Sequence, residues 1–125
     1  MADATKTPGA GAAPSGKVRY CVFTWVPEDQ LAAWNTWHNE VHVPEVVDTP
    51  QMRAARKYRV ADNSFPGDWQ PQYVTVYELD SVEDLSAYMD GPGIGLREDY
   101  AARYGAVGKI ARMVLVEDTR FDVVE

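Results

Sequence analysis

The two histidines of this 125-residue chain lie four residues apart, in a short segment that also holds two of its four tryptophans. Trp34, His38 and His42 follow one another at intervals of four residues, which places their side chains on one face of a helix. Imidazole titrates closer to neutrality than any other side chain, so it is suited to general acid–base catalysis. We therefore predict that this helix face forms one wall of a ligand pocket.

Three residues of this segment are candidates for catalysis. His42 is the first candidate for a general acid or base, because Pro44 is expected to end or kink the helix beside it, where imidazole can reach into a cleft. The alternative for His42 is a hydrogen bond to a backbone carbonyl at the helix end. His38 is expected either to share a proton or hydrogen bond with the same ligand or to be a partly buried structural residue. Glu45 is predicted to orient an imidazole through its second nitrogen.

The same side chains raise the hypothesis of a metal site, with His38, His42 and Glu45 as ligands. The zinc-protease pattern requires a glutamate directly after the first histidine, but Asn39 stands there. The only cysteine is Cys21, which is expected to be a buried, reduced thiol. We therefore expect no metal. The sequence also lacks a phosphate-binding glycine loop after a strand and a nucleophile elbow.

Aromatic residues are the candidates for substrate contacts. Trp34 shares the histidine face, so we expect it to line the pocket, although tryptophans at helical spacing commonly pack on a sheet. Tyrosines on predicted strands are candidates to donate a hydroxyl to a carbonyl or developing enolate oxygen. These are Tyr20, Tyr58, Tyr73 and Tyr77, and the alternative for each is a core aromatic with a satisfied hydroxyl.

The composition favours one globular domain. A length of 125 residues is enough for a single core, and the 46% hydrophobic content excludes wholesale disorder. The net charge of −7, without a Lys/Arg cluster, argues against a nucleic-acid partner. No apolar stretch is long enough to span a membrane, and residues 1–16 lack the hydrophobic segment of a secretion signal. We expect a cytoplasmic protein with a flexible tail over 1–16 and one domain over 17–125.

The predicted elements follow the order β-α-β-β-α-β. Strands are expected over 17–26, 52–61 and 72–79 and at the end of 105–116, and helices over about 27–44 and 82–89, with a further turn or two over 96–104. This order is that of the ferredoxin-like α+β fold, with a four-stranded antiparallel sheet and the helices on one face. Because the strands are apolar on both sides, we expect a second copy to cover the bare face in a symmetric homodimer.

The segment Trp37-His38-Asn39-Glu40-Val41-His42-Val43-Pro44, followed by Ala55-Arg56-Lys57-Tyr58-Arg59, resembles the EthD-like members of the dimeric α+β barrel superfamily. The segments Tyr88-Met89-Asp90-Gly91-Pro92 and Arg112-Met113-Val114 are similar too, so the resemblance covers roughly residues 17 to 117. Its one specific motif is the histidine-x-proline helix end, in which His42 matches the family's histidine. The family often has a glycine before the second strand, whereas this chain has Thr49-Pro50-Gln51-Met52.

The resemblance implies a dimer with a pocket between each sheet and its own helices. It also implies a small enzyme without a cofactor, since the relatives are mostly isomerases, dehydratases, cyclases and oxygenases of aromatic, polyketide-derived or lactone compounds. The leading hypothesis is a lyase or isomerase in which His42 moves a proton on a hydrophobic substrate, while His38 or a tyrosine stabilises the oxygen where charge accumulates. The alternatives are a cofactor-free oxygenase of an aromatic substrate, a non-catalytic small-molecule-binding or stress-related protein, and haem binding through a histidine.

Overall fold

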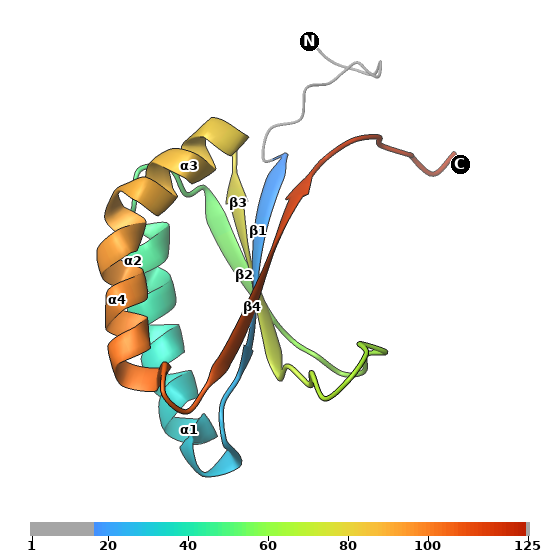
Figure 1. Cartoon of the computed structure of the whole chain (residues 1–125). Coiled ribbons are helices and arrows are strands. Elements are labelled where there is room, and N and C mark those ends of the chain that lie inside the picture. Colours follow the sequence, from blue (N-terminus) through green and yellow to red (C-terminus); the bar gives the residue numbers. More distant parts are fainter. Residues whose placement is uncertain (1–16, 125) are drawn as a thin grey trace.

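The computed structural model describes residues 17–124, which form a four-stranded antiparallel sheet with helices on one face (Figure 1). The elements are β1 (Val18–Trp25), α1 (Glu28–Trp37), a π-helical turn η1 (His38–His42), α2 (Val43–Val47), β2 (Ala54–Arg59), β3 (Tyr73–Leu79), α3 (Val82–Asp90), α4 (Pro92–Tyr104) and β4 (Lys109–Val116). The strand order is β2-β3-β1-β4. The predicted ferredoxin-like α+β fold is confirmed. The tail expected over 1–16 lies outside the described residues.

The register of the strands decides which side chains meet the helices, because successive residues of a strand point to opposite faces. Tyr20 of β1 pairs with Tyr77 of β3, and both are almost fully buried. They belong to a core cluster that includes Leu85 and Tyr88 of α3. The face of the sheet that carries Tyr20 and Tyr77 is therefore the face covered by the helices.

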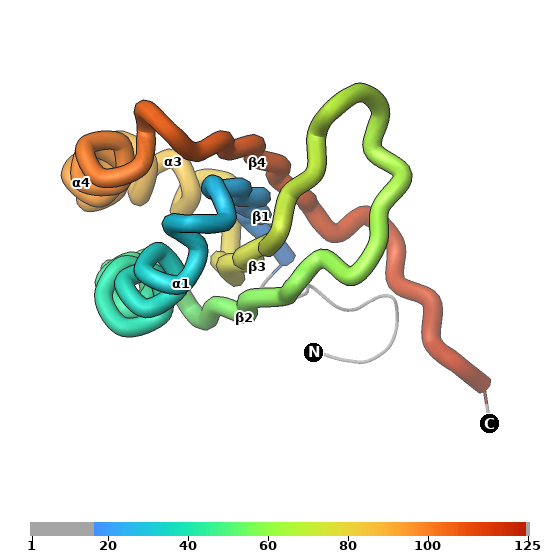
Figure 2. The backbone as a smooth tube through the Cα atoms, turned by 90° about the horizontal axis from the view of Figure 1, so that it is seen from below, coloured from blue at the N-terminus to red at the C-terminus, as the bar shows by residue number. Residues whose placement is uncertain are grey.

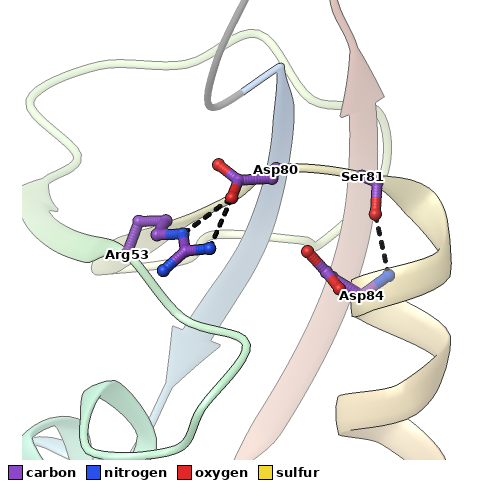
Figure 3. A network of polar contacts seen from close by, with 4 residues as sticks. All are labelled: Arg53, Asp80, Ser81 and Asp84. Atoms are coloured by element: carbon purple, nitrogen blue, oxygen red, sulfur yellow. Dashed lines mark hydrogen bonds and ion pairs between the residues drawn. The ribbon is translucent and has the colours of Figure 1, made fainter.

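The start of α3 is fixed by two polar contacts (Figure 3). The Ser81 hydroxyl caps the helix by accepting the backbone N–H of Asp84 at 3.0 Å, at the start of the helix that the sequence predicts over 82–89. Just before the cap, Asp80 accepts a hydrogen bond from Arg53 Nε at 2.8 Å. This second contact ties the segment that leads into β2 to the end of β3.

The first helical segment does not end at Pro44, so one of the two outcomes expected there, a helix end or a kink, is wrong. It widens at η1, where the Val43 N–H donates to the carbonyl of His38 five residues earlier, and then continues through α2 to Val47. In a regular α-helix the proline ring would clash with the carbonyl four residues before it. The wider turn directly before Pro44 avoids that clash and lets the chain stay helical.

The segment after α3 is also more helical than the sequence predicts. The 13-residue helix α4 begins at Pro92, where the missing N–H of proline is tolerated in a first turn. Gly93 is buried, and a Cβ there would lie 2.7 Å from the carbonyl oxygen of Tyr88. The absence of a side chain at Gly93 therefore allows α4 to begin close against the end of α3.

The other face of the sheet carries no helix within residues 17–124 (Figures 1 and 2). Tyr58, Met113 and Leu115 lie there and are 50%, 42% and 45% exposed. The loop over residues 60–72 projects on this side in Figure 2, and its Phe65 meets Phe23 of β1 edge-on with ring centroids 5.6 Å apart. Within residues 17–124, none of the helices has the length and apolar composition that a membrane span requires.

Candidate functional site

A cavity of about 210 Å³ lies between the sheet and its helices. Strands β1, β3 and β4 line one side of it, and η1, α2, α3 and α4 line the other. It is bordered by two clusters of packed side chains, one around Tyr20, Tyr77 and Tyr88 and the other around Trp34 and Tyr100. The cavity is thus the gap that the two halves of the core leave between them.

His38 lines the cavity and is held by an aromatic stack. It is 2% exposed, and its ring lies 4.2 Å from that of Trp34 with an angle of 17° between the planes. Trp34 Nε1 in turn donates to the hydroxyl of Tyr100 at 3.0 Å. Trp34 itself is not part of the cavity wall. The prediction that Trp34 lines the pocket is therefore wrong, because the indole stacks on the His38 imidazole and the imidazole forms the wall.

His42 lines the same cavity, and its ring centroid lies 5.5 Å from that of His38. It stacks on Trp37 at 5.0 Å and meets Tyr100 edge-on at 5.3 Å. The Nδ1 atoms of both imidazoles are buried without a hydrogen-bond partner in the described part of the chain. The structure thus brings the two histidines together in the wall of one cavity.

Burial decides the charge of both imidazoles. It lowers the pKa of His38 to about 3, helped by the positive charge of Lys57 and by His42. Burial also lowers the pKa of His42 to about 4, although the carboxylate of Asp99 acts in the opposite direction. Both rings are therefore neutral at physiological pH.

Lys57 supports the stack from outside the cavity. Its ammonium lies 4.5 Å from the ring centroid of Trp34 and donates to Asn35 Oδ1 at 2.7 Å and Asn39 Oδ1 at 2.8 Å. Burial lowers the pKa of Lys57 to about 8. Because its positive charge disfavours protonation of His38, Lys57 helps to keep that imidazole neutral.

Glu45 is not brought to the histidines. It is exposed on α2, outside the cavity wall, and the carboxylate that acts on His42 belongs to Asp99 of α4. The prediction that Glu45 orients an imidazole is corrected, because the helix continues past Pro44 and does not turn Glu45 back toward the site. Across residues 17–124 no group of three or more histidine, cysteine or acidic side chains is arranged to hold a metal ion.

The tyrosines divide between the two faces of the sheet. Tyr20 and Tyr77 line the cavity with ring centroids 6.0 Å apart, as expected for substrate-binding candidates. Tyr58 pairs with Val74 on the opposite face, half exposed, so its predicted contact with a ligand in this cavity is corrected. Tyr73 packs against Trp34, and its hydroxyl accepts a hydrogen bond from Asn35.

Several cavity residues were not found by the sequence reasoning. Those on α4 are Leu96, Arg97, Tyr100, Ala101 and Tyr104, and Tyr88 and Arg112 come from α3 and β4. The last four of the α4 residues follow one another at the i, i+3, i+4, i+7 spacing of one helix face, which is a pattern that the sequence shows. They were missed because only a turn or two of helix was expected in that segment.

The chain belongs to the family described as "Domain of unknown function (DUF4286)", whose model matches residues 17–117. No curated protein matches the chain significantly. The fold is similar to that of an ethyl tert-butyl ether D (EthD) family protein from Bacillus halodurans, with 20% identity, a TM-score of 0.65, and coverage of 81% of this chain and 98% of the other.

Two further solved structures share the fold. A dabb family protein with a ferredoxin-like fold from Mesorhizobium loti has 10% identity and a TM-score of 0.62, with coverage of 82% of this chain and 97% of that one. Hydroxynitrile lyase from Passiflora edulis has 15% identity and a TM-score of 0.55, with coverage of 84% and 96%. The predicted resemblance to EthD-like α+β barrel proteins is confirmed, and identities this low speak to the fold alone.

Proposed function

We propose that this member of the DUF4286 family is a cofactor-independent lyase or isomerase acting on a small aromatic, polyketide-like or lactone substrate. The observation that carries the proposal is the pair of neutral imidazoles, His38 and His42, side by side in the wall of a cavity that five tyrosines also line. A neutral imidazole has an unprotonated nitrogen at physiological pH, so it can accept a proton and return it. The similarity in fold to a hydroxynitrile lyase supports the view that this architecture accommodates lyase chemistry.

In the proposed reaction, His42 removes a proton from a carbon next to a carbonyl group of the substrate. The electron pair of the broken C–H bond moves to the carbonyl oxygen and forms an enolate. The imidazolium then returns the proton at another atom, which completes an isomerisation, or protonates a leaving group on the β-carbon, which completes an elimination. His38 lies beside His42 and positions the substrate for this transfer.

The enolate oxygen would be stabilised by tyrosine hydroxyls. Burial raises the pKa of Tyr77 above its ordinary value, and it raises the pKa of Tyr88 to about 12. Both side chains therefore remain protonated hydrogen-bond donors at neutral pH. Donors that are already oriented toward the position of developing charge are an effective source of transition-state stabilisation.

Proton abstraction can be tested before the natural substrate is known. We expect the protein to accelerate the exchange of α-protons for deuterium in 2-indanone, 1-tetralone or dihydrocoumarin, followed by ¹H NMR in D₂O at pH 7.5. General acid–base catalysis contributes on the order of a hundred- to ten-thousandfold, so His42→Ala should remove most of the acceleration. Exchange of all three compounds at equal rates with the wild type and a folded His42→Ala variant would contradict the proposal.

We also propose that the protein is a symmetric homodimer built on the bare face of the sheet, where Met113 and Leu115 are exposed. Sedimentation equilibrium should give twice the chain mass of 14.0 kDa. Leu115→Asp would bury a carboxylate in the interface and should yield monomers. Val82→Asp is the matched control, because Val82 is 45% exposed on α3 and away from that face. A wild-type monomer would contradict the proposed dimer.

A further inference from the structure

The charge of the cavity is opposite to that of the protein. The chain has 19 acidic residues against 12 lysines and arginines, a net charge of −7. The cavity wall nevertheless contains two arginines, Arg97 and Arg112, and no aspartate or glutamate. A concave site with cations and no carboxylate favours an anionic ligand over a neutral or cationic one.

Arg112 supplies one of these two cations. It lies on β4 opposite Val22 of β1, which places it on the helix-facing side of the sheet beside the cavity. It makes no hydrogen bond or ion pair with any residue of the described chain. Its charge nevertheless acts within the cavity, since it opposes the effect of burial on the pKa of Tyr88 and Tyr100.

Arg97 contributes a second cation whose charge is not neutralised by its contacts. Its Nη2 donates to the backbone carbonyl of Met89 at 2.7 Å, and its Nη1 lies 3.3 Å from the Met89 sulfur. Both partners are uncharged, so they hold the guanidinium in place at the end of α3 without cancelling its charge. The hydroxyl-bearing side chains of Tyr20 and Tyr88 line the same cavity and are further donors for an anion.

We propose that the ligand of this cavity carries a carboxylate, which binds Arg112 with help from Arg97, while its apolar body lies against the aromatic wall that holds His42. The inference rests on the proposed function only in taking the cavity as the substrate site. An α-keto acid or aromatic acid with an acidic C–H bond fits both requirements. Guanidinium pairs with carboxylate oxygens through two parallel hydrogen bonds, which would fix the ligand's orientation relative to the imidazoles.

Binding of two nearly isosteric probes tests the charge requirement separately from catalysis. Benzoate and benzamide differ in charge but little in shape, and their dissociation constants can be measured by NMR titration at pH 7.5 and low salt. We expect benzoate to bind at least about tenfold more tightly than benzamide, because a hydrogen bond between two charged groups is stronger than one to a neutral amide. Arg112→Met should weaken benzoate binding by about tenfold and leave benzamide binding unchanged.

Arg120→Met is the matched control, because it removes the same charge from the exposed segment after β4, outside the cavity. It should bind benzoate as the wild type does. Failure of benzoate to bind at millimolar concentration, equal affinity for the two probes, or unchanged benzoate affinity in Arg112→Met would overturn the inference. His42→Ala separates the two proposals, because it should lose proton exchange and keep the preference for benzoate over benzamide.

Discussion

The imidazole of His38 and the indole of Trp34 stack face to face with ring centroids 4.2 Å apart, and the ammonium of Lys57 lies 4.5 Å from the centroid of the same indole. A proton on His38 would place a second positive charge on this stack in a site that is 2% exposed. The arrangement therefore favours the neutral ring, which is what a proton acceptor at neutral pH requires. It also couples folding to pH.

The first prediction concerns stability against pH. Both histidines have an ordinary pKa of 6.5, lowered in the folded protein to about 3 for His38 and about 4 for His42. Above pH 6.5 they are neutral in both states and have no effect. As the pH falls below 6.5, the unfolded chain binds protons that the folded protein excludes, so the free energy of unfolding decreases. Urea midpoints at pH 7.5, 6 and 5 should fall in that order.

His38→Phe isolates the contribution of His38. It keeps an aromatic ring against Trp34 but removes one titrating group, so the fall in urea midpoint between pH 7.5 and 5 should be smaller than in the wild type. That range lies above the ordinary pKa values of aspartate and glutamate, which limits their contribution. Identical pH dependence in the two proteins would show that His38 is not held neutral by the fold.

The second prediction concerns the buried hydrogen bond behind His38. Tyr100→Phe removes the acceptor of the Trp34 indole N–H and leaves that donor buried without a partner. We expect a loss of about 1–3 kcal/mol in the free energy of unfolding, measured by urea denaturation. Tyr104→Phe is the control, because the Tyr104 hydroxyl has no hydrogen bond to any residue of the described chain. A similar loss in both variants would mean that removal of a hydroxyl in itself, and not loss of the hydrogen bond to Trp34, is responsible.

The third prediction concerns Asp99, a positioning residue that raises the pKa of His42 against the larger effect of burial. Asp99→Asn should lower the pKa of His42 below about 4, as measured by NMR titration of the imidazole signals. If His42 is the general base, the acid limb of the exchange rate should move to lower pH by the same amount. Glu98→Gln is the matched control, because Glu98 is the neighbour of Asp99 on α4 and is exposed. It should change neither the pKa of His42 nor the acid limb of the exchange rate. An unmoved His42 titration in Asp99→Asn would contradict this.

The fourth prediction separates two glycines of α4. A Cβ at Gly93 would lie 2.7 Å from the Tyr88 carbonyl oxygen and 2.8 Å from Arg97 Nη1, whereas a Cβ at Gly95 would meet nothing within 4 Å. Gly95→Ala should raise the free energy of unfolding by up to about 1 kcal/mol through helix propensity. Gly93→Ala should lower it, because the clash with backbone outweighs that gain. Equal stabilisation of both variants would contradict the close packing of α3 and α4.

The fold could be predicted because it depends on patterns within single segments. The alternation of apolar residues in β1 and β3 and the Ser81 cap of α3 are local features, and the order of elements follows from them. A site residue could be predicted only where a local pattern also determines which way its side chain points. His38 and His42 line the same cavity because they lie four residues apart in one helical segment.

Tyr58 could not be placed in the same way. Which face of the sheet it occupies depends on the register of β2 against β3, where it meets Val74, and a shift of one residue would reverse the face. The sequence of β2, with its imperfect alternation, does not determine that register. Arg112 could not be identified from the sequence for a related reason. It is a candidate because the cavity wall contains no aspartate or glutamate, and several elements distant in sequence together form that wall.

The π-helical turn makes the length of the segment from His38 to His42 as important as its residues. Removing one residue there would close the wide turn into a regular one, restore the clash of the Pro44 ring with the carbonyl four residues before it, and change the spacing of the two imidazoles from four residues to three. The loop over 60–72 lies on the other side of the sheet and has no such constraint. Related sequences should therefore vary in length at that loop while keeping the histidine spacing unchanged.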